Sequence, residues 1–272
     1  MDSRQEIRWV VDQAEIVVRA AGAYLRENVD SRADVRYKSE VDLVTKFDLG
    51  AQDILVGRLS ALFPDHGFLA EEGLSRPGAS GYRWVLDPLD GTTNFAHTLP
   101  VFSVSAGLEL EGRMVAGLVF DPMREEMFRA VAGGGAFLNG RRISVSAVDD
   151  LGRSLLATGF PYDLRTNPVN NVDHWNRFIV RAQALRRCGS AAMDLCYVAC
   201  GRFDGFWEIK LKPWDVAAGA LLVVEAGGRV TDFQGREHRI EVPQALATNG
   251  LIHEAMMRVL EEGQSGHQEE RE

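Results

Sequence analysis

The sequence has no long apolar segment and only three cysteines among its 272 residues. No run approaches the ~20 apolar residues that a membrane-spanning helix requires, and the amphipathic N-terminal segment lacks the pattern of a signal peptide. Cys196 and Cys200, close to Cys188, share one predicted helical face, which could bind a soft metal but is more typical of core packing. We therefore expect a reduced, cytoplasmic protein.

A surplus of basic residues is also missing. Lysine and arginine total 30 against 39 aspartates and glutamates, so the formal net charge is −9. Nucleic acids and anionic membranes attract basic surfaces, so we expect neither as a partner. The acidic balance does not exclude an anionic substrate, because bound divalent cations would reverse the local charge.

Two common kinds of motif are absent as well. None of the six histidines falls in a metal-binding motif, which argues against zinc, and there is no G-x-x-x-x-G-K-[ST] phosphate loop. The triple glycine at 133–135 could be taken for a phosphate loop, but it precedes the hairpin signal Asn139-Gly140 and not a helix. We favour a bulge or a tight turn at this position.

The sequence does contain an alternation of helical and extended hydrophobic patterns, which is typical of a mixed α/β protein. Helices are expected at 4–28, from an Asp48 cap to Pro64, and at 170–184, 190–200, 215–226 and 252–261. Extended segments are expected at 35–45, 67–70, 83–86, 101–110, 114–121, 126–132, 154–158, 185–187, 203–209, 229–232 and 245–248. We expect one domain over residues 1–262, with two lobes that meet near residue 150, and a disordered acidic tail at 263–272.

Acidic side chains follow two neighbouring predicted strands at the points where the strands end. Glu71 and Glu72 follow the first strand, and Asp87 follows the next one. Open α/β sheets usually place their sites at the C-terminal ends of strands. We therefore expect these carboxylates to border one functional site.

The segment 87–92 combines two carboxylates, a proline, a glycine and a hydroxyl. The proline bends the chain so that Asp87 and Asp90 can converge around the Leu89 carbonyl, and Gly91 lets the backbone approach an anion. Such oxygen ligands suit Mg²⁺, although an ordinary turn with a helix cap is the alternative. The D-x-x-D-G-T spacing differs from the D-x-D-G-T of phosphatases that form an aspartyl-phosphate, which favours attack by water.

Four motifs of the sequence resemble those of the inositol monophosphatase family. They are Asp87-Pro88-Leu89-Asp90-Gly91-Thr92-Thr93-Asn94-Phe95, Trp214-Asp215-Val216-Ala217-Ala218-Gly219, Asp42-Leu43-Val44-Thr45-Lys46-Phe47-Asp48 and Glu71-Glu72. The similarity runs from the first helix to about residue 260. It implies an α/β (α+β) fold, the layered αβαβα sandwich of the inositol monophosphatase and fructose-1,6-bisphosphatase type.

The resemblance also implies a site for two or three Mg²⁺ ions. Glu71, Asp87 and the Leu89 carbonyl would hold one ion. Asp87, Asp90 and Asp215 would hold a second, so that Asp87 bridges the two, and a third, weaker ion would lie near Glu71. Asp215 could instead be only the cap of its helix, but capping does not account for its match to the motif.

The remaining roles implied by the resemblance concern the attacking water and the substrate. Asp48 and Thr92, together with Glu71, would orient and deprotonate the water. The implied substrate-binding positions are Asp90, Gly91, Thr92, Gly189, Ser190, Glu208 and Asp215.

Several charged residues have two interpretations. Glu208 could contact substrate hydroxyls, as its family position implies, or could pair with Lys210 or Lys212. Arg186 and Arg187 could bind a second phosphate or form structural ion pairs, and we favour the ion pairs. The residues that could belong either to the site or to the surface are Glu72 and Lys38.

These residues predict Mg²⁺-dependent hydrolysis of a small phosphate monoester by water, with lithium sensitivity implied by the resemblance. myo-Inositol monophosphate is the favoured substrate, and fructose 1,6-bisphosphate and histidinol phosphate are alternatives on the same scaffold. A regulatory protein with an idle site is the non-enzymatic alternative, and the presence of every expected carboxylate weighs against it. The family often forms homodimers, so we expect one here. The choice of alcohol is expected to lie within residues 160–210.

Overall fold

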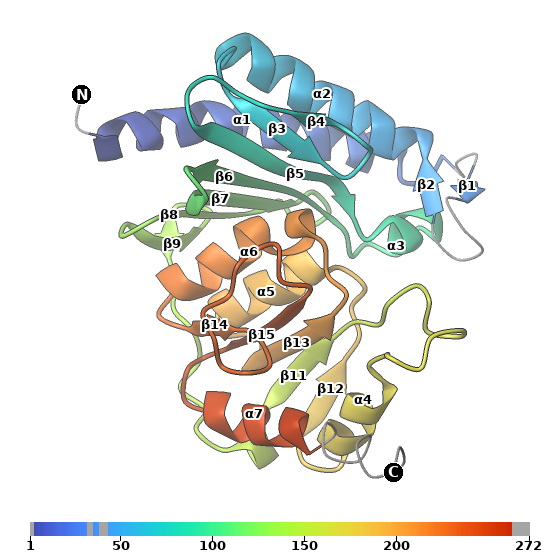
Figure 1. Ribbon diagram of the computed structural model, residues 1–272. Helices are drawn as coiled ribbons and strands as arrows, with labels where there is room; N and C mark the ends of the chain where they lie inside the picture. The colour runs from blue at the N-terminus through green and yellow to red at the C-terminus, as the bar shows by residue number, and fades with distance from the viewer. Residues whose placement is uncertain (1–2, 32–34, 38–42, 263–272) are drawn as a thin grey trace.

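The computed structural model describes residues 3–31, 35–37 and 43–262 of the chain. Lys38, Asp42 and the tail 263–272, which is predicted to be disordered, lie outside the described residues. The described segments form five alternating layers of helices and sheets (Figure 1). The predicted layered αβαβα sandwich is therefore confirmed.

The helices are α1 Ser3–Asn28, α2 Lys46–Leu62, α3 Thr92–Ala96, α4 Val172–Ile179, α5 Ala191–Ala199, α6 Pro213–Glu225 and α7 His253–Glu261. The strands are β1 Val35–Tyr37, β2 Leu43–Thr45, β3 Gly67–Ala70, β4 Ser75–Arg76, β5 Tyr82–Asp90, β6 Ser103–Leu110, β7 Arg113–Asp121, β8 Glu126–Val131, β9 Gly135–Leu138, β10 Arg141–Arg142, β11 Leu155–Thr158, β12 Ala184–Arg186, β13 Gly205–Ile209, β14 Arg229–Thr231 and β15 Gln244–Thr248. Helices α1 and α2 cover the eight-stranded sheet, α5 and α6 separate it from the five-stranded sheet, and α4 and α7 cover the far side (Figure 1).

The eight-stranded sheet has the order β10-β9-β8-β7-β6-β5-β3-β4. Its pairs are antiparallel except for β3 and β5, which run parallel. Helices α1 and α2 pack on one face because each carries an apolar stripe, and Leu25 and Leu55 are buried there with Trp84 and Leu86. The parallel pair places Glu71, directly after β3, beside Leu86 and Asp87 of β5, and the Glu71 N–H donates to the Leu86 carbonyl oxygen.

Helix α6 lies unusually close to the other face of this sheet. A Cβ atom on Gly117 would come within 2.7 Å of the Ala218 carbonyl oxygen, and one on Gly107 within 2.9 Å of the Ala217 Cβ. The small residues on both sides therefore permit a contact that larger side chains would exclude. This contact fixes the N-terminal turn of α6, and with it Asp215, relative to β5 and β6.

The five-stranded sheet has the order β12-β11-β13-β15-β14. Strand β11 runs parallel to β12 and β13, whereas β15 runs antiparallel to β13 and β14. Trp207 and Leu246 are buried on its outer face with Phe178 of α4 and Met256 of α7. Its inner face packs against α5 and α6, so the middle helical layer is shared by both sheets.

Strand β5 is longer than the sequence predicts. The strand continues through Pro88 to Asp90, although the predicted strand ends at Leu86. Its pairing with β6 shifts register between Asp87 and Asp90, so the proline lies in a bulge and not in a loop. A bulge accommodates the missing N–H of proline and turns the neighbouring side chains to new directions.

Two predicted helix starts and one helix length are also wrong. Helices α2 and α6 begin at Lys46 and Pro213, so Asp48 and Asp215 lie in the first turn and not at the N-cap position. Proline suits the first helical position because its missing N–H has no partner there. The predicted helix 170–184 ends at Ile179, because Ala184 already belongs to β12 and pairs with β11.

The triple glycine forms a tight turn between β8 and β9, as predicted. The backbone N–H groups of Gly133 and Gly135 each donate to one carboxylate oxygen of Glu225, both at 2.7 Å. An acidic side chain at the end of α6 thus occupies the concavity that a phosphate would otherwise need. The phosphate-loop alternative is thereby disfavoured.

None of the helices in the described part of the chain combines the length and the apolarity that crossing a bilayer needs. Cys188, Cys196 and Cys200 are free thiols. Cys196 is buried in the core between the sheets, which agrees with its predicted packing role.

Candidate active site

A cavity of about 490 Å³ opens where β5, β13, α3, α5 and α6 meet. It brings together most of the residues that the sequence singles out, although they are spread over 144 positions of the chain from 71 to 215. These lining residues are Glu71, Asp87, Leu89, Asp90, Gly91, Thr92, Gly189, Ser190, Glu208 and Asp215. Their individual roles stay predictions.

A second hollow, of about 690 Å³, lies between α1 and the β7–β10 region. It contains none of the predicted site residues. Arg19 and Arg129 pair with Glu15, and Arg26 pairs with Glu125, so its arginines are already bound to carboxylates. The smaller cavity is therefore the better candidate for an active site.

The floor of the cavity is formed by the bulged end of β5. Asp87 is 2% exposed, and its Oδ1 atom accepts a hydrogen bond of 3.0 Å from the Leu89 N–H. Burial raises the pKa of Asp87 well above its usual value, and the charges of Glu71, Asp90 and Asp215 raise it further. These carboxylates therefore lie near enough for their negative charges to repel one another.

Asp90 is held from the other half of the chain. Its Oδ2 atom accepts hydrogen bonds from the Ser190 hydroxyl at 2.6 Å and from the Ala192 N–H at 2.7 Å. Burial raises the pKa of Asp90 to about 6, while the Ser190 and Ala192 hydrogen bonds oppose the rise. The two bonds engage one carboxylate oxygen and leave Oδ1 available to a ligand.

Asp215 lies in the first turn of α6, where its Oδ2 atom accepts a 2.7 Å hydrogen bond from the Lys212 N–H. Burial raises the pKa of Asp215 to about 8, and this hydrogen bond opposes the rise. Asp215 thus supports the start of the helix and also faces the cavity. The capping and ligand interpretations are compatible.

The donor set suits a hard divalent cation. Buried carboxylates that raise one another's pKa are relieved by a cation that neutralises their charge. In the described ranges, no group of three or more histidine, cysteine, aspartate or glutamate side chains is placed so that it could hold a metal ion by itself. Mg²⁺ fits this arrangement because it usually retains several waters and takes only one or two carboxylates, with substrate phosphate supplying other oxygens.

Asp48 lies behind the floor of the cavity and is fully buried. The Thr92 hydroxyl lies 3.0 Å from Asp48 Oδ1 and 3.1 Å from the Leu89 carbonyl oxygen, and it donates to one of them at a time. The Thr92 side chain therefore connects α2 with the bulge of β5. Gly91 precedes it with φ 101°, and a Cβ there would come within 3.0 Å of the Val101 carbonyl oxygen.

Glu208 occupies the wall that β13 contributes. Burial raises the pKa of Glu208 well above its usual value, and the charges of Asp215, Asp194 and Asp90 act in the same direction. Lys210 binds Asp163 at 2.6 Å and 2.8 Å, so the predicted alternative of a Glu208–Lys210 pair is wrong.

Two arginines lie at the end of β12, Arg186 as its last residue and Arg187 directly after it. Arg187 lies at the mouth of the cavity, where its charge lowers the pKa of Glu208 and Asp194 against the effect of burial. Arg186 donates to the carbonyl oxygen of Leu185. Neither arginine forms an ion pair within the described segments, so the favoured interpretation as structural ion pairs finds no support.

A family model for the inositol monophosphatase family matches residues 8–265 of the chain. The chain belongs to the inositol monophosphatase family. This confirms the resemblance that the four motifs carry, and membership supports a phosphatase.

Named relatives in this family have more than one description. A protein named Nus factor SuhB from Pseudomonas aeruginosa is 42% identical over 253 residues, covering 89% of this chain and 92% of the relative. An inositol-1-monophosphatase from Mesorhizobium japonicum is 41% identical over 227 residues, covering 83% and 85%. The solved structure of an inositol monophosphatase from Anabaena (Nostoc) has a TM-score of 0.87 and 41% identity, covering 94% of this chain and 97% of that one.

Sequence reasoning missed three residues of this inositol monophosphatase-type cavity. A Cβ on Gly159 would lie 2.1 Å from Glu208 Oε1, so only glycine leaves room for that carboxylate. Asn171 donates 2.6 Å hydrogen bonds to Thr158 Oγ1 and to the Gly159 carbonyl oxygen, which fixes this wall from behind. Asp194 lines the cavity, and its buried Oδ1 atom has no hydrogen-bond partner among the described residues. Of the three, only Gly159 carries a signal in the sequence, because a glycine at the end of a predicted strand can mark the close approach of another group.

Proposed function

We propose that this chain is a Mg²⁺-dependent phosphomonoesterase with myo-inositol monophosphate as its preferred substrate. The observation that carries the proposal is the convergence of Glu71, Asp87, Asp90 and Asp215 on one cavity, although they come from distant parts of the sequence. Burial, and then repulsion from these acids, raises the pKa of Asp87. Such repulsion is expected in a divalent-cation site when no cation neutralises its carboxylates.

In this proposal, Glu71, Asp87 and the Leu89 carbonyl would hold one ion, and Asp87, Asp90 and Asp215 would hold a second. Mg²⁺ bound there would supply an acidified water as the nucleophile and charge neutralisation at the leaving oxygen. The protein residues align the phosphate between these two positions, and alignment with electrostatics provides most of the acceleration in phosphoryl transfer.

The Thr92–Asp48 pair manages the proton of the attacking water. Asp48 accepts the Thr92 hydroxyl proton at 3.0 Å, which leaves the Thr92 oxygen free to accept a hydrogen bond from water. As the water oxygen bonds to phosphorus, its proton moves to Thr92 and the Thr92 proton moves to Asp48. The P–O bond to the alcohol breaks, and the leaving oxygen takes a proton from solvent water. The backbone N–H groups of Gly91 and Thr92 bind the phosphate oxygens.

The carboxylates of Glu208 and Asp194, which line the cavity, favour a hydroxyl-rich alcohol as the leaving group. Glu208 and the unpartnered Oδ1 atom of Asp194 are acceptors for substrate hydroxyl groups, with Gly189 and Ser190 at the adjoining helix start. A polyol such as inositol satisfies several such acceptors at once. Fructose 1,6-bisphosphate would use Arg187 for its second phosphate, and histidinol phosphate would place its amine against Glu208.

The test is phosphate release from a panel of these three monoesters, with Mg²⁺ and with EDTA. We expect EDTA-sensitive turnover, fastest with myo-inositol monophosphate. Turnover of no substrate would overturn the enzymatic proposal, and a preference for another ester would reassign the substrate. Inhibition of the same reaction by lithium tests the lithium sensitivity.

A regulatory role is a second candidate, because one relative at 42% identity is named Nus factor SuhB. Such a role would not require turnover, so a variant without activity would keep it. Asp90→Asn should therefore abolish phosphate release and leave a regulatory function intact. The acidic net charge of −9 still favours a protein partner over a nucleic acid.

We also propose that residues 1–262 form a single domain and that the protein is cytoplasmic. Two copies of the chain would form a homodimer. Light scattering coupled to size exclusion should give twice the chain mass of 30.1 kDa. A monomer mass at micromolar concentration would contradict the dimer and would leave the chemistry of the cavity unaffected.

A further inference from the structure

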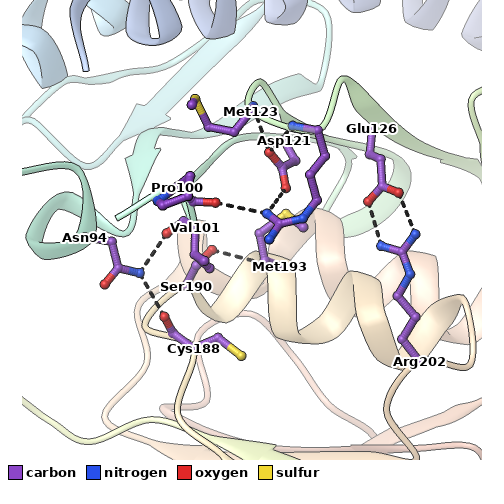
Figure 2. A network of polar contacts seen from close by, with 11 residues as sticks. Asn94, Pro100, Val101, Asp121, Met123, Glu126, Cys188, Ser190, Met193 and Arg202 are labelled. Atoms are coloured by element: carbon purple, nitrogen blue, oxygen red, sulfur yellow. Dashed lines mark hydrogen bonds and ion pairs between the residues drawn. The ribbon is translucent and has the colours of Figure 1, made fainter. Parts of the chain in front are cut away.

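Asn94 is part of the longest recognised motif, but none of the proposed catalytic steps uses it. Its side chain is 6% exposed. Its Nδ2 group donates two hydrogen bonds, one of 2.7 Å to the Val101 carbonyl oxygen and one of 2.8 Å to the Cys188 carbonyl oxygen (Figure 2). The first acceptor follows α3 in the same half of the chain, whereas the second belongs to the other half. One amide therefore joins the two halves at the cavity.

The bond to the first half rests on a rigid support. The Arg124 guanidinium donates to the Pro100 carbonyl oxygen at 3.0 Å and to Asp121 Oδ2 at 2.9 Å. Asp121 is fully buried at the end of β7 and also accepts from the N–H groups of Met123 and Arg124. The Pro100 carbonyl is thus attached to the end of β7, and the acceptor of Asn94 belongs to the next residue, Val101.

The bond to the second half ends close to a proposed metal ligand. Cys188 is followed by Gly189 and by Ser190, whose hydroxyl donates to Asp90 Oδ2 at 2.6 Å. Space between the halves is tight there, because a Cβ on Gly189 would lie 3.0 Å from Asn94 Nδ2. A shift of the segment 188–190 away from Asn94 would therefore carry the Ser190 donor away from Asp90.

We infer that Asn94 is a positioning residue that holds the start of α5 against the segment 90–96 and thereby fixes the orientation of Asp90. The inference rests on the proposed function in one respect, the assignment of Asp90 as a metal ligand. Groups that orient a metal ligand through a hydrogen bond typically change metal affinity or activity by about 10–100-fold when they are removed.

The test uses Asn94→Leu, which keeps the approximate volume and removes both donors. Its matched control is Asn249→Leu, because Asn249 is also buried and its Nδ2 group donates to Ser146 Oγ at 2.9 Å and to the Val148 carbonyl oxygen at 2.7 Å. Asn249 does not line the cavity. Both variants leave two partly buried acceptors without this donor, and Asn249→Leu also removes the acceptor of the Leu251 and Ile252 N–H groups, so its loss of stability should be at least as large as that of Asn94→Leu.

The first measurement is Mn²⁺ binding to metal-free protein by calorimetry, which does not depend on turnover. Asn94→Leu should weaken Mn²⁺ binding by about 10–100-fold, whereas Asn249→Leu should stay within about twofold of the original protein. Equal effects in the two variants, or none in Asn94→Leu, would overturn the inference. If Asn94→Leu does not fold, Asn94→Ser keeps one donor and should show a smaller loss in the same assay.

The second measurement asks whether Asn94 acts on Asp90 through the Ser190 hydroxyl or disturbs the cavity in some other way. Ser190→Ala removes the donor to Asp90, so Asn94→Leu should add little to its effect on Mn²⁺ binding and on kcat. If the effects of Asn94→Leu and Ser190→Ala multiply in the double variant, Asn94 acts independently of Ser190, and the inference is overturned. If the original protein binds Mn²⁺ but hydrolyses no ester, the proposed function fails while the Mn²⁺ measurements still decide the role of Asn94.

Discussion

The carboxylates of the cavity differ in how many of their oxygens the protein already engages. Asp90 and Asp215 each have one oxygen held by donors from α5 or from the turn before α6. Asp87 is held by the Leu89 N–H, and Asp194 keeps a buried oxygen without a partner in the described part of the chain. An oriented carboxylate presents its remaining oxygen in one direction, which is what a cation with strict octahedral geometry needs.

Asp90→Asn tests this arrangement most directly. The amide keeps the shape and can still accept from the Ser190 hydroxyl and the Ala192 N–H through its carbonyl oxygen. It removes the negative charge, so we expect phosphate release to fall below a tenth of the original rate while circular dichroism remains unchanged. Retention of more than about a tenth, a difference under ~1.4 kcal/mol in the barrier, would contradict the assignment of Asp90 as a metal ligand.

Gly159→Ala tests the wall that faces the alcohol. The new methyl group would lie 2.1 Å from Glu208 Oε1, so the carboxylate must move out of its position. We expect kcat/KM for myo-inositol monophosphate to fall by about tenfold or more, since a displaced hydrogen-bond acceptor costs on the order of 1–3 kcal/mol. The control is Gly57→Ala in α2, where nothing lies within 4 Å and activity should not change. Unchanged kinetics in Gly159→Ala would show that Glu208 does not contact the substrate.

Among the elements, most of the helices and strands could be predicted because their apolar residues recur at the spacing of a helix or a strand. The wrong boundaries lie where a partner element decides. Strand β5 continues past Pro88 because β6 pairs with it on both sides of a bulge, and α4 ends early because β11 recruits Ala184 into the sheet. Neither partner is visible in the local sequence, so local propensity could not reveal either boundary.

A buried histidine of α7 contacts both β14 and β15. His253, at the start of α7, lies 2.9 Å from Thr231 Oγ1 and 2.9 Å from Thr248 Oγ1. Burial and the Arg229 charge lower the pKa of His253 to about 4, although Glu254 acts in the opposite direction. The imidazole is therefore neutral in the folded protein at pH 5–6, where an unfolded histidine, with a pKa of about 6.5, is largely protonated.

The sign of the resulting pH dependence follows from proton binding. Between about pH 6.5 and pH 4 the unfolded chain binds a proton at His253 that the folded chain does not, so stability falls as the pH falls. We test this with urea titrations at several pH values. Across this pH window, the free energy of unfolding should decrease less for His253→Gln than for the original protein. A matched change at the exposed His97, His97→Gln, should leave the decrease unaltered. Equal slopes for the original protein and His253→Gln would contradict the buried neutral imidazole.

At the scale of the whole molecule, the motifs could identify residues that line the cavity but could not reveal how its two walls are joined. The acids and Gly91 were predicted because their residue types are unusual directly after an apolar strand. The contacts of Asn94 with Cys188 and of Glu225 with the triple glycine span 94, 92 and 90 positions. Such contacts depend on the packing of α5 and α6, which no local pattern encodes.

The shared helical layer predicts cooperative unfolding of the described chain. Because α5 and α6 pack against both sheets, neither sheet keeps its core if the other opens. Leu246→Ala, in the core beneath α7, should cost about 2–5 kcal/mol and should lower the protection of amides in β6 and β13 equally. Native-state hydrogen exchange provides the measurement. A loss of protection confined to β13 would show that the two sheets open independently.

The layer order also has a consequence during synthesis of the chain. The eight-stranded sheet is complete once β10 has emerged at Arg142, but its inner cover arrives only with α5 and α6, which end at Glu225. At a typical rate of about 5–20 residues per second, the interval lasts on the order of ten seconds. During that time Val85, Val119 and Phe128 face solvent or a chaperone. Asp215 is delivered by the same late helix, so a nascent chain acquires its last proposed ligand and the cover of its first sheet in a single event.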